Sequence, residues 1–206
     1  MTTGGEGGMV VTEQPEWWDR AWSFKDHGKS YSAVYHRQHA PGFRWLHEQF
    51  GTNWRLTEMQ AALGRRGLSQ LPAWIARRRA NAAILTEYFS KIRGLRVTVP
   101  PPEIGHCYYK YYVFVRSEEL KSGWDRDRIM AAINAEGVPC FSGCCSEIYL
   151  EKAFCEELRP KRRLPVAREL GETSLMFMVH PTLGEGEMLD TCRAVEKIME
   201  AATGYL

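Results

Sequence analysis

The residues of this chain that could carry out chemistry lie in a few short segments. One is the glycine-rich segment of residues 4–8, in which four of five residues lack side chains, so that backbone N–H groups could approach an anion closely. It has neither the lysine nor the hydroxyl residue of a nucleotide-binding P-loop, and it does not lead from a strand into a helix. We therefore interpret it as a tight turn that leads into the next segment.

Cysteine thiols form a second group of candidates. The six cysteines do not show the doubled C-x-x-C spacing of a zinc site; they stand at positions 107, 140, 144, 145, 155 and 192. The adjacent pair Cys144 and Cys145, close to Cys140, suggests metal or redox chemistry at first sight. Because no histidine pair accompanies them, small buried residues are the favoured interpretation. We expect reduced thiols and no metal.

The composition excludes several classes of protein. With 27 lysines and arginines against 25 acidic residues, the formal net charge is +2, too balanced for a dedicated nucleic-acid binder. The arginine and lysine triplets at 77–79 and 161–163 are interpreted as solvated faces. No stretch approaches the ~20 apolar residues that cross a bilayer, and no secretory signal is visible. We expect a cytoplasmic protein of 44% hydrophobic residues with a real core.

The elements that must position these residues differ between the two parts of the chain. In the first part, residues 9–12 are apolar and β-branched, as in a strand. Thr12 as N-cap and Pro15 resemble a helix start, and tryptophans follow at helical spacing. Residues 25–50 lack periodicity and are interpreted as a long functional or interface loop. A short helix is predicted from Thr57 to Gly64, a glycine that would end it.

The second part is predicted to be a compact α+β domain. Periodicity predicts helices at 71–92, 124–136 and 186–203, and strands at 95–99, 107–115, 138–141 and 174–179. Their order predicts a small, mostly antiparallel sheet with helices against it. The long helix at 71–92 marks the boundary, so the chain divides into a first portion of residues 1–69 and a domain of residues 70–206.

Residues 51–64, with the sequence GTNWRLTEMQAALG, carry the most informative pattern. With the glycine-rich turn and the arginine-faced helix, this segment closely resembles the sugar aminotransferases of the DegT/DnrJ/EryC1/StrS family, in which G-x-N-x-R leads into a helix with a Q-A-A-x-G pattern. Further matches follow in the family's order, at His27-Gly28, Val138-Pro139-Cys140, Tyr149 and His180-Pro181-Thr182-Leu183. Each match is weak alone, but their ordered combination is specific.

The resemblance implies an α/β enzyme of fold type I, represented here mainly by its C-terminal small α+β domain (70–206) with a remnant of the large domain that binds pyridoxal 5′-phosphate (1–69). In that family the cofactor forms a Schiff base with a lysine a few residues before the glycine-rich turn. Only Met1, Thr2 and Thr3 precede the turn. We therefore expect the lysine upstream of Met1 and no catalytic residue in this chain; Lys25 and Lys29 lie on the wrong side of segment 9–12.

The resemblance also implies binding residues. Asn53 would reach across a dimer interface to the phosphate of the neighbouring subunit's cofactor, and Arg55 could add a bidentate contact to phosphate or to a sugar diphosphate. Glu147, Tyr149 and His180 stand where members of the family meet the sugar nucleotide or the mouth of the cleft. Without the resemblance, Asn53 reads as a turn residue, Arg55 as a surface charge and His180 as a strand-end histidine.

The implied reaction is the transfer of an amino group from an amino-acid donor, such as glutamate, to the keto carbon of a nucleotide-linked sugar, in the synthesis of polysaccharide or antibiotic sugars. A homodimer is expected, since the apolar segment 9–12 and the tryptophans of the first helix need a partner surface. The alternative hypothesis is a catalytically inactive fragment that acts only as a binding or dimerisation module. A thiol or zinc protein is a third possibility.

Overall fold

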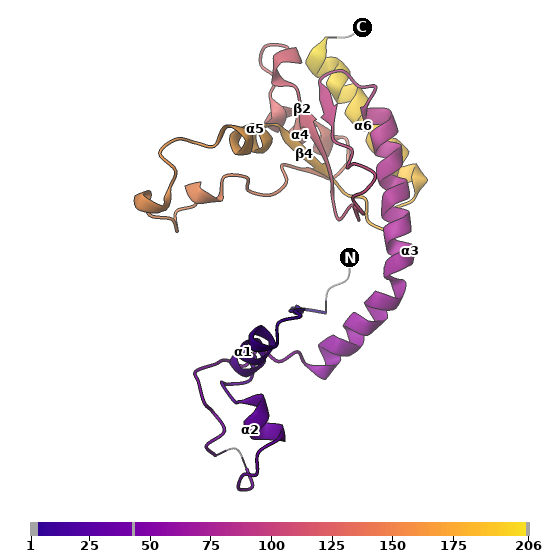
Figure 1. Ribbon diagram of the computed structural model, residues 1–206. Helices are drawn as coiled ribbons and strands as arrows, with labels where there is room; N and C mark the ends of the chain where they lie inside the picture. Colours follow the sequence, from indigo (N-terminus) through magenta and orange to yellow (C-terminus); the bar gives the residue numbers. More distant parts are fainter. Residues whose placement is uncertain (1–3, 43, 205–206) are drawn as a thin grey trace. The chain divides into compact units, whose positions relative to one another are not determined.

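The computed structural model describes residues 4–42 and 44–204, and the chain forms two compact units, Met1–Leu71 and Pro72–Leu206. Among the described residues, none of the helices combines the length and the apolar composition that a membrane crossing requires. The α-helices and strands β2 and β4 are labelled in Figure 1.

Aromatic packing joins the two short helices of the first unit. Helix α1 spans Pro15–Lys25, and α2 spans Tyr31–Tyr35. The ring of Tyr31 meets Trp18 and Trp22 edge to face, with centroids 4.9 and 5.0 Å apart. The predicted helix is therefore present, but Gln14 is its N-cap; Thr12 instead accepts a hydrogen bond from the Gln14 N–H at 3.1 Å.

The predicted strand at residues 9–12 is absent. The segment carries no strand pairing, and its apolar side chains are open to solvent, with Val10 78% and Val11 85% exposed. A strand needs a neighbouring strand to bond its backbone, and the described part of the chain offers none here. The apolar pattern was read correctly, whereas the conclusion that it forms a strand was wrong.

The loop at 25–50 contains α2 and takes part in two isolated antiparallel bridges: Lys29 with His47 lies within it, and Asp26 pairs with Asn53 just beyond it. Gly28 makes this arrangement possible. It has a positive φ of 80°, and a Cβ atom there would lie 1.6 Å from the carbonyl oxygen of Gln49. The loop is thus folded back on itself at Gly28.

Helix α3 is a single helix over Glu58–Phe89, where two were predicted. Thr57 and Gln60 form a reciprocal cap at its start: the Gln60 N–H donates to Thr57 Oγ1 at 3.3 Å, and the Thr57 N–H donates to Gln60 Oε1 at 3.2 Å. Gly64 keeps a negative φ and so does not end the helix. Pro72 also lies within the helix, at the boundary between the two units.

The second unit is built on a four-stranded antiparallel sheet in the order β1-β2-β4-β3, which confirms the expected small antiparallel sheet. Its strands are β1 Leu95–Val97, β2 Tyr111–Val115, β3 Cys140–Phe141 and β4 Ser174–Phe177. The central pair β2 and β4 aligns Tyr111 with Phe177. Every strand is shorter than predicted; the one expected from residue 107 begins only at 111, after Tyr108 takes a positive φ of 45°.

Helices supply the other layer of the core. Buried residues of α3 pack with those of α4 (Arg126–Ala135) and α6 (Glu185–Thr203) against the sheet. Phe89 of α3 is fully buried, with its ring centroid 5.3 Å from that of Phe177 and 5.9 Å from that of Tyr111. A further helix, α5 (Pro165–Thr173), was not predicted and contacts β2. Short 3-10 turns complete the unit at Ser117–Glu119, Ile148–Leu150 and Glu156–Leu158.

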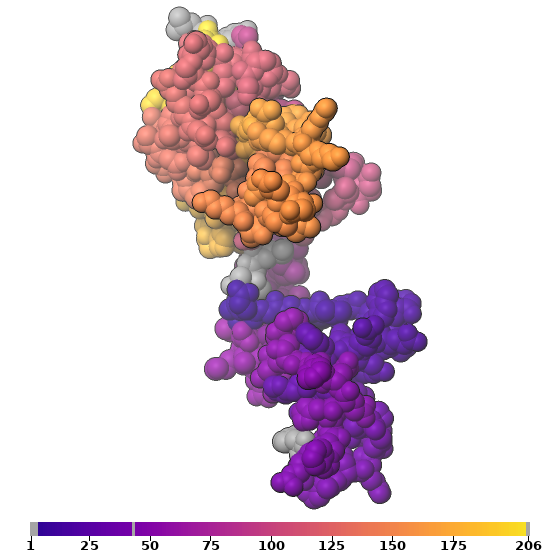
Figure 2. Space-filling view, turned by 90° about the vertical axis from the view of Figure 1, so that its left-hand side faces the viewer, coloured from indigo at the N-terminus to yellow at the C-terminus, as the bar shows by residue number. Residues whose placement is uncertain are grey.

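Residues 142–164, between β3 and α5, form an extended segment that we call the arm. Figure 1 shows it leaving the sheet after β3 and returning at α5. In Figure 2 the arm, in orange, lies on the face of the second unit that is turned toward the viewer. Two of its residues, Cys144 and Cys145, are exposed, so the expectation that both are buried was wrong; Cys140, on β3, is buried.

Candidate functional site

Asn53 and Arg55 lie on an extended segment that the backbone holds firmly against the end of α1. The Trp54 N–H donates to the Lys25 carbonyl at 3.0 Å, and the Thr52 N–H donates to the Phe24 carbonyl at 2.7 Å. Because side chains alternate along an extended segment, Asn53 and Arg55 share one side of it. Asn53 is exposed, and in the described part of the chain its side-chain amide makes no hydrogen bond.

Asp26 gathers the cationic side chains near Asn53. Its carboxylate pairs with the Arg55 guanidinium and with Lys29 Nζ, the latter at 3.6 Å. Burial alone would raise the pKa of Asp26, but Lys29 and Arg55 outweigh burial and hold this pKa below its usual range. Arg55 is therefore oriented by a carboxylate, which leaves part of its fork for a second anion. Sequence reasoning missed Asp26, because its two partners lie 3 and 29 residues away.

The glycine-rich turn lies against the start of α3. Gln60 Nε2 donates to the Glu6 carbonyl at 2.8 Å, so one side chain both caps the helix and holds the turn. A Cβ atom at position 4 would lie 3.1 Å from the Gln60 carbonyl oxygen, which is why a glycine suits this contact. These contacts favour the tight turn over the phosphate cradle. They also link the two sequence patterns, because Gln60 of the Q-A-A pattern binds the backbone of the glycine-rich turn.

In the arm, Glu147 and Tyr149 are brought together. The Tyr149 hydroxyl donates to Glu147 Oε1 at 2.6 Å and accepts from the Leu164 N–H at 2.9 Å. The Arg163 guanidinium clasps the same carboxylate, with Nε 2.8 Å from Oε1 and Nη2 on Oε2. Glu147 is only 8% exposed, so its carboxylate faces its own arm. The hydrogen bonds from Arg163 and then from Tyr149 lower the pKa of Glu147 from 4.5 to about 2.

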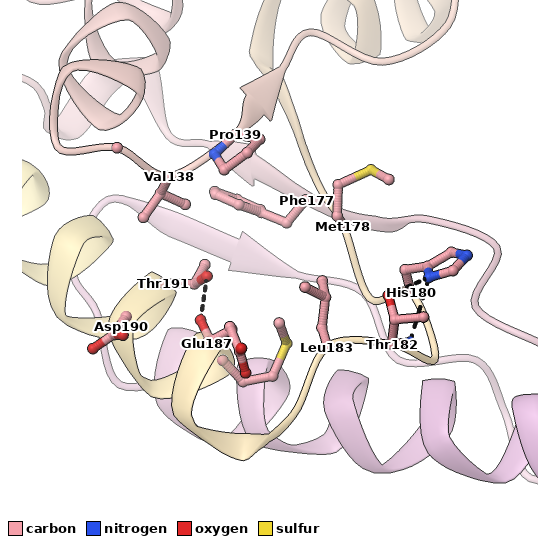
Figure 3. Close-up of a pocket in the computed structure, with 12 residues that line it drawn as sticks. Val138, Pro139, Phe177, Met178, His180, Thr182, Leu183, Glu187, Asp190 and Thr191 are labelled. Atoms are coloured by element: carbon pink, nitrogen blue, oxygen red, sulfur yellow. Dashed lines mark hydrogen bonds between the residues drawn. The ribbon is translucent and has the colours of Figure 1, made fainter.

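His180 lies in a tight turn after β4, at the edge of a pocket of about 450 Å³. Figure 3 shows Val138, Pro139 and Phe177 on one side of this pocket, Glu187 and Asp190 of α6 on another, and His180 with Thr182 at one end. His180 Nδ1 lies 2.8 Å from Thr182 Oγ1. Burial, and then the charge of Arg78, lower the pKa of His180 below 6.5.

One arginine of the basic triplets, Arg78, is not the solvated residue that the sequence suggested, and a second, Arg163, is exposed but engaged in an ion pair. Arg163 belongs to the Glu147 cluster, and Arg78 is 2% exposed inside the second unit. Arg77, Arg78 and Arg79 are consecutive on α3 and of one residue type, so the sequence does not indicate which of them turns inward. Arg78 is buried and donates to the carbonyls of Tyr108 and Tyr109, whereas its neighbour Arg79 is exposed and donates to the carbonyl of His106.

Comparison with known proteins adds independent information. The model of the DegT/DnrJ/EryC1/StrS aminotransferase family matches residues 1–196. The structure of an aminotransferase from Psychrobacter cryohalolentis is 55% identical, with a TM-score of 0.89 over 98% of this chain and 53% of that chain. This likeness confirms the fold class predicted from the sequence.

Two curated relatives are transaminases or synthases of amino sugars. The dTDP-3-amino-3,4,6-trideoxy-alpha-D-glucose transaminase of Streptomyces venezuelae is 29% identical over 95% of this chain and 46% of its own length. The GDP-perosamine synthase of Escherichia coli O157:H7 is 26% identical over 95% of this chain and 48% of its own length. The chain thus spans about half the length of these relatives.

Proposed function

This chain belongs to the DegT/DnrJ/EryC1/StrS aminotransferase family, and from this we propose that it works as the C-terminal half of an aminotransferase that uses pyridoxal 5′-phosphate. The proposed reaction moves an amino group from an amino-acid donor to a keto carbon of a nucleotide-linked sugar. The names of the relatives from Streptomyces venezuelae and Escherichia coli, one a dTDP-linked and one a GDP-linked amino sugar, support this substrate class.

The observation that carries the proposal is the presentation of Asn53 and Arg55. An exposed amide without a partner in the described structure, held on a fixed backbone beside an oriented guanidinium, matches what a phosphate oxygen requires. These residue types fit the phosphate of the cofactor. When bound, pyridoxal phosphate supplies the electron sink that makes the substrate carbon reactive. Asn53 and Arg55 would hold its phosphate, in the cofactor site of a second subunit.

In the second unit, we propose Glu147, Tyr149 and His180 for the sugar nucleotide. Both Glu147 oxygens already accept hydrogen bonds from its own arm, so its part would be to hold Tyr149 and Arg163 in place. Arg163, 42% exposed at its side chain, could then pair with a diphosphate. His180 would donate a hydrogen bond at the edge of its pocket.

The alternative, a binding or dimerisation module without catalysis, is favoured by the lysines of the first unit. Lys25 lies over the ring of Trp22, 4.9 Å from its centroid, and Lys29 is paired with Asp26. Both follow the glycine-rich turn of residues 4–8 in the sequence, whereas the family resemblance sets the cofactor-bearing lysine a few residues before that turn. The chemistry therefore needs an amine from outside these residues.

Two further parts of the proposal concern the binding partners of the protein and its location in the cell. The exposed apolar side chains of the first unit, such as Trp17 and Trp54, support a homodimer. The formal net charge of only +2 supports a protein that does not bind nucleic acid. All six cysteines are free thiols, which supports the reducing environment of the cytoplasm.

The test is a reconstitution. The 206-residue chain is combined with the part of the Psychrobacter cryohalolentis aminotransferase that it does not match, and supplied with cofactor, glutamate and a panel of dTDP- and GDP-linked keto-sugars. We expect amination by the mixture and none by either part alone. Asn53→Ala should weaken cofactor binding about tenfold, as loss of one hydrogen bond to a charged group predicts, whereas Thr52→Ala, on the other side of the segment, should not.

Amination by the 206-residue chain alone would contradict the need for an outside amine. A mixture that assembles and binds a nucleotide sugar but aminates none of the panel would favour the binding-module alternative.

A further inference from the structure

Arg78 carries a positive charge that is buried inside the second unit. It is 2% exposed on the buried side of α3, its Nη1 donates to the carbonyls of Tyr108 at 3.2 Å and Tyr109 at 2.8 Å, and its Nε is buried without a partner. Among the described residues no carboxylate pairs with it. A guanidinium does not lose its proton inside a protein, and burying it without a carboxylate partner lowers the free energy of unfolding. The fold therefore retains Arg78 at the expense of stability.

Asn81 stands one turn further along the same face of α3 and makes the matching contact. It is 1% exposed, and its Nδ2 donates to the carbonyls of His180 at 3.3 Å and Leu183 at 3.1 Å. Tyr111 pairs with Phe177 across the central strands, so the loop before β2 and the turn after β4 leave the same end of the sheet. Arg78 therefore holds the loop before β2 to α3, and Asn81 holds the turn after β4 to the same helix.

Thr182 decides how the imidazole of His180 is protonated. The Thr182 N–H, which can only donate, lies 3.4 Å from His180 Nδ1, and the Thr182 hydroxyl lies 2.8 Å from the same nitrogen. Nδ1 must then accept, and a neutral imidazole that accepts at Nδ1 carries its proton at Nε2. Figure 3 shows the second ring nitrogen pointing away from Thr182.

The charges around His180 act in the same direction. Its burial, followed by the positive charge of Arg78, lowers its pKa. The carboxylates of Glu187 and Asp190, which line the same pocket from α6, would act against this. However, Asp190 pairs with Arg193 and Glu187 is directed to the Gly184 N–H, from which it accepts at 2.9 Å, and burial and Arg78 remain the dominant causes of the lowered pKa of His180.

We propose that Arg78, Asn81 and Thr182 are positioning residues that hold His180 as a neutral imidazole with its Nε2–H free to donate. A donor of this kind suits an oxygen acceptor, a sugar hydroxyl or a phosphate oxygen, and its charge does not change on binding. It is not a general acid that gives up a proton at neutral pH. The nature of the acceptor depends on the proposed function, whereas the tautomer and its cause do not.

The experiment follows the imidazoles of the 206-residue chain, labelled with ¹⁵N-histidine, by long-range ¹H–¹⁵N correlation spectra between about pH 5 and 8. His180→Gln assigns the signal. We expect the Nε2–H tautomer and a midpoint below 6.5, the ordinary pKa of a histidine. In Arg78→Met the midpoint should rise, and in Arg78→Lys, which keeps the charge, it should stay low. Arg79→Met, one residue along the helix on its exposed side, is the matched control and should change nothing.

Thr182→Val provides the independent test of the tautomer. Loss of the hydroxyl should mix the Nδ1–H form into the spectrum. An Nδ1–H tautomer in the unchanged chain would overturn the proposal, as would equal midpoints in Arg78→Met and Arg79→Met. Should Arg78→Met not fold, a higher midpoint in Arg78→Lys, or a Thr182→Val spectrum identical to the unchanged one, would equally overturn it. No cofactor or substrate is needed, so this result and that of the reconstitution are independent.

Discussion

Glu147 acts as a strut between the two ends of the arm. It binds Tyr149 close by in the sequence and Arg163 sixteen residues later. The carboxylate must be ionised to accept from both, and the contacts with Arg163 and Tyr149 hold its pKa at about 2. The order of the arm therefore depends on one charge.

This dependence predicts how stability changes with pH. Because the folded pKa of Glu147 is lowered from 4.5 to about 2, its contribution is complete above pH 4.5 and is lost as the pH falls from 4.5 toward 2. In this pH window, the Arg163→Gln variant should therefore take up at most about one proton fewer on unfolding than the unchanged chain does. Its unfolding free energy should also be lower at pH 7. Urea unfolding at a series of pH values measures both.

Arg162→Gln is the matched control, because the neighbouring arginine belongs to the same triplet and is exposed. It should leave the pH dependence unchanged. If Arg163→Gln and Arg162→Gln gave the same curves between pH 2 and 4.5, the strut would have no role in stability.

The residues of the candidate site were predictable from the sequence to different degrees. Asn53 and Arg55 follow from a local pattern. Asp26, Arg78 and Asn81 do not, because their significance lies in partners that the fold brings from elsewhere; Asn81, for example, reaches a carbonyl 99 residues away. Sequence supplies the donors but not which carbonyl each one meets.

At the scale of elements, α3 shows why two helices were predicted where one exists. Glycine and proline end helices when the backbone needs a positive φ or loses a hydrogen bond that nothing replaces. Here Gly64 stays helical, and the capping pair Thr57 and Gln60 sets only the start. The sequence signal at Gly64 was local, whereas the helix continues through it.

Phe89 is the largest fully buried side chain that α3 contributes to the core of the second unit. It is fully buried between the rings of Tyr111 and Phe177, so Phe89→Ala leaves a cavity in addition to the lost burial. We expect a loss of about 3–5 kcal/mol in unfolding free energy. Tyr88→Ala, at a neighbouring position that is 41% exposed, should cost about 1 kcal/mol or less. Urea denaturation followed by circular dichroism compares the two; equal losses would place the centre of the core elsewhere.

At the scale of the whole molecule, burial is uneven. The core is in the second unit, while large apolar side chains of the first unit are open, among them Phe50 at 99% and Met9 at 87% exposure. Isolated apolar residues on a surface are ordinary, but so many in one small unit indicate a surface that a partner covers. The sequence shows that these residues are apolar, but it could not show that the described part of the chain would leave them uncovered.

Self-association should follow from this exposure. We expect the 206-residue chain to sediment as a dimer or larger species at micromolar concentration, and a variant with Val10→Ser and Val11→Ser to shift toward the monomer. Glu13→Ser is the control, since it changes an exposed polar residue of the same segment. A monomer at every concentration, for the unchanged chain, would contradict the idea that these side chains meet a partner.

The middle of the sheet also fixes when the second unit can form during synthesis. Its two central strands, β2 and β4, are joined only when residues 174–177 meet residues 111–114, and the arm lies between them in the chain. Pairings so distant in sequence are slow to form. During synthesis, residues 174–177 must therefore leave the ribosome before β4 can pair with β2, and until then β2 can pair only with β1.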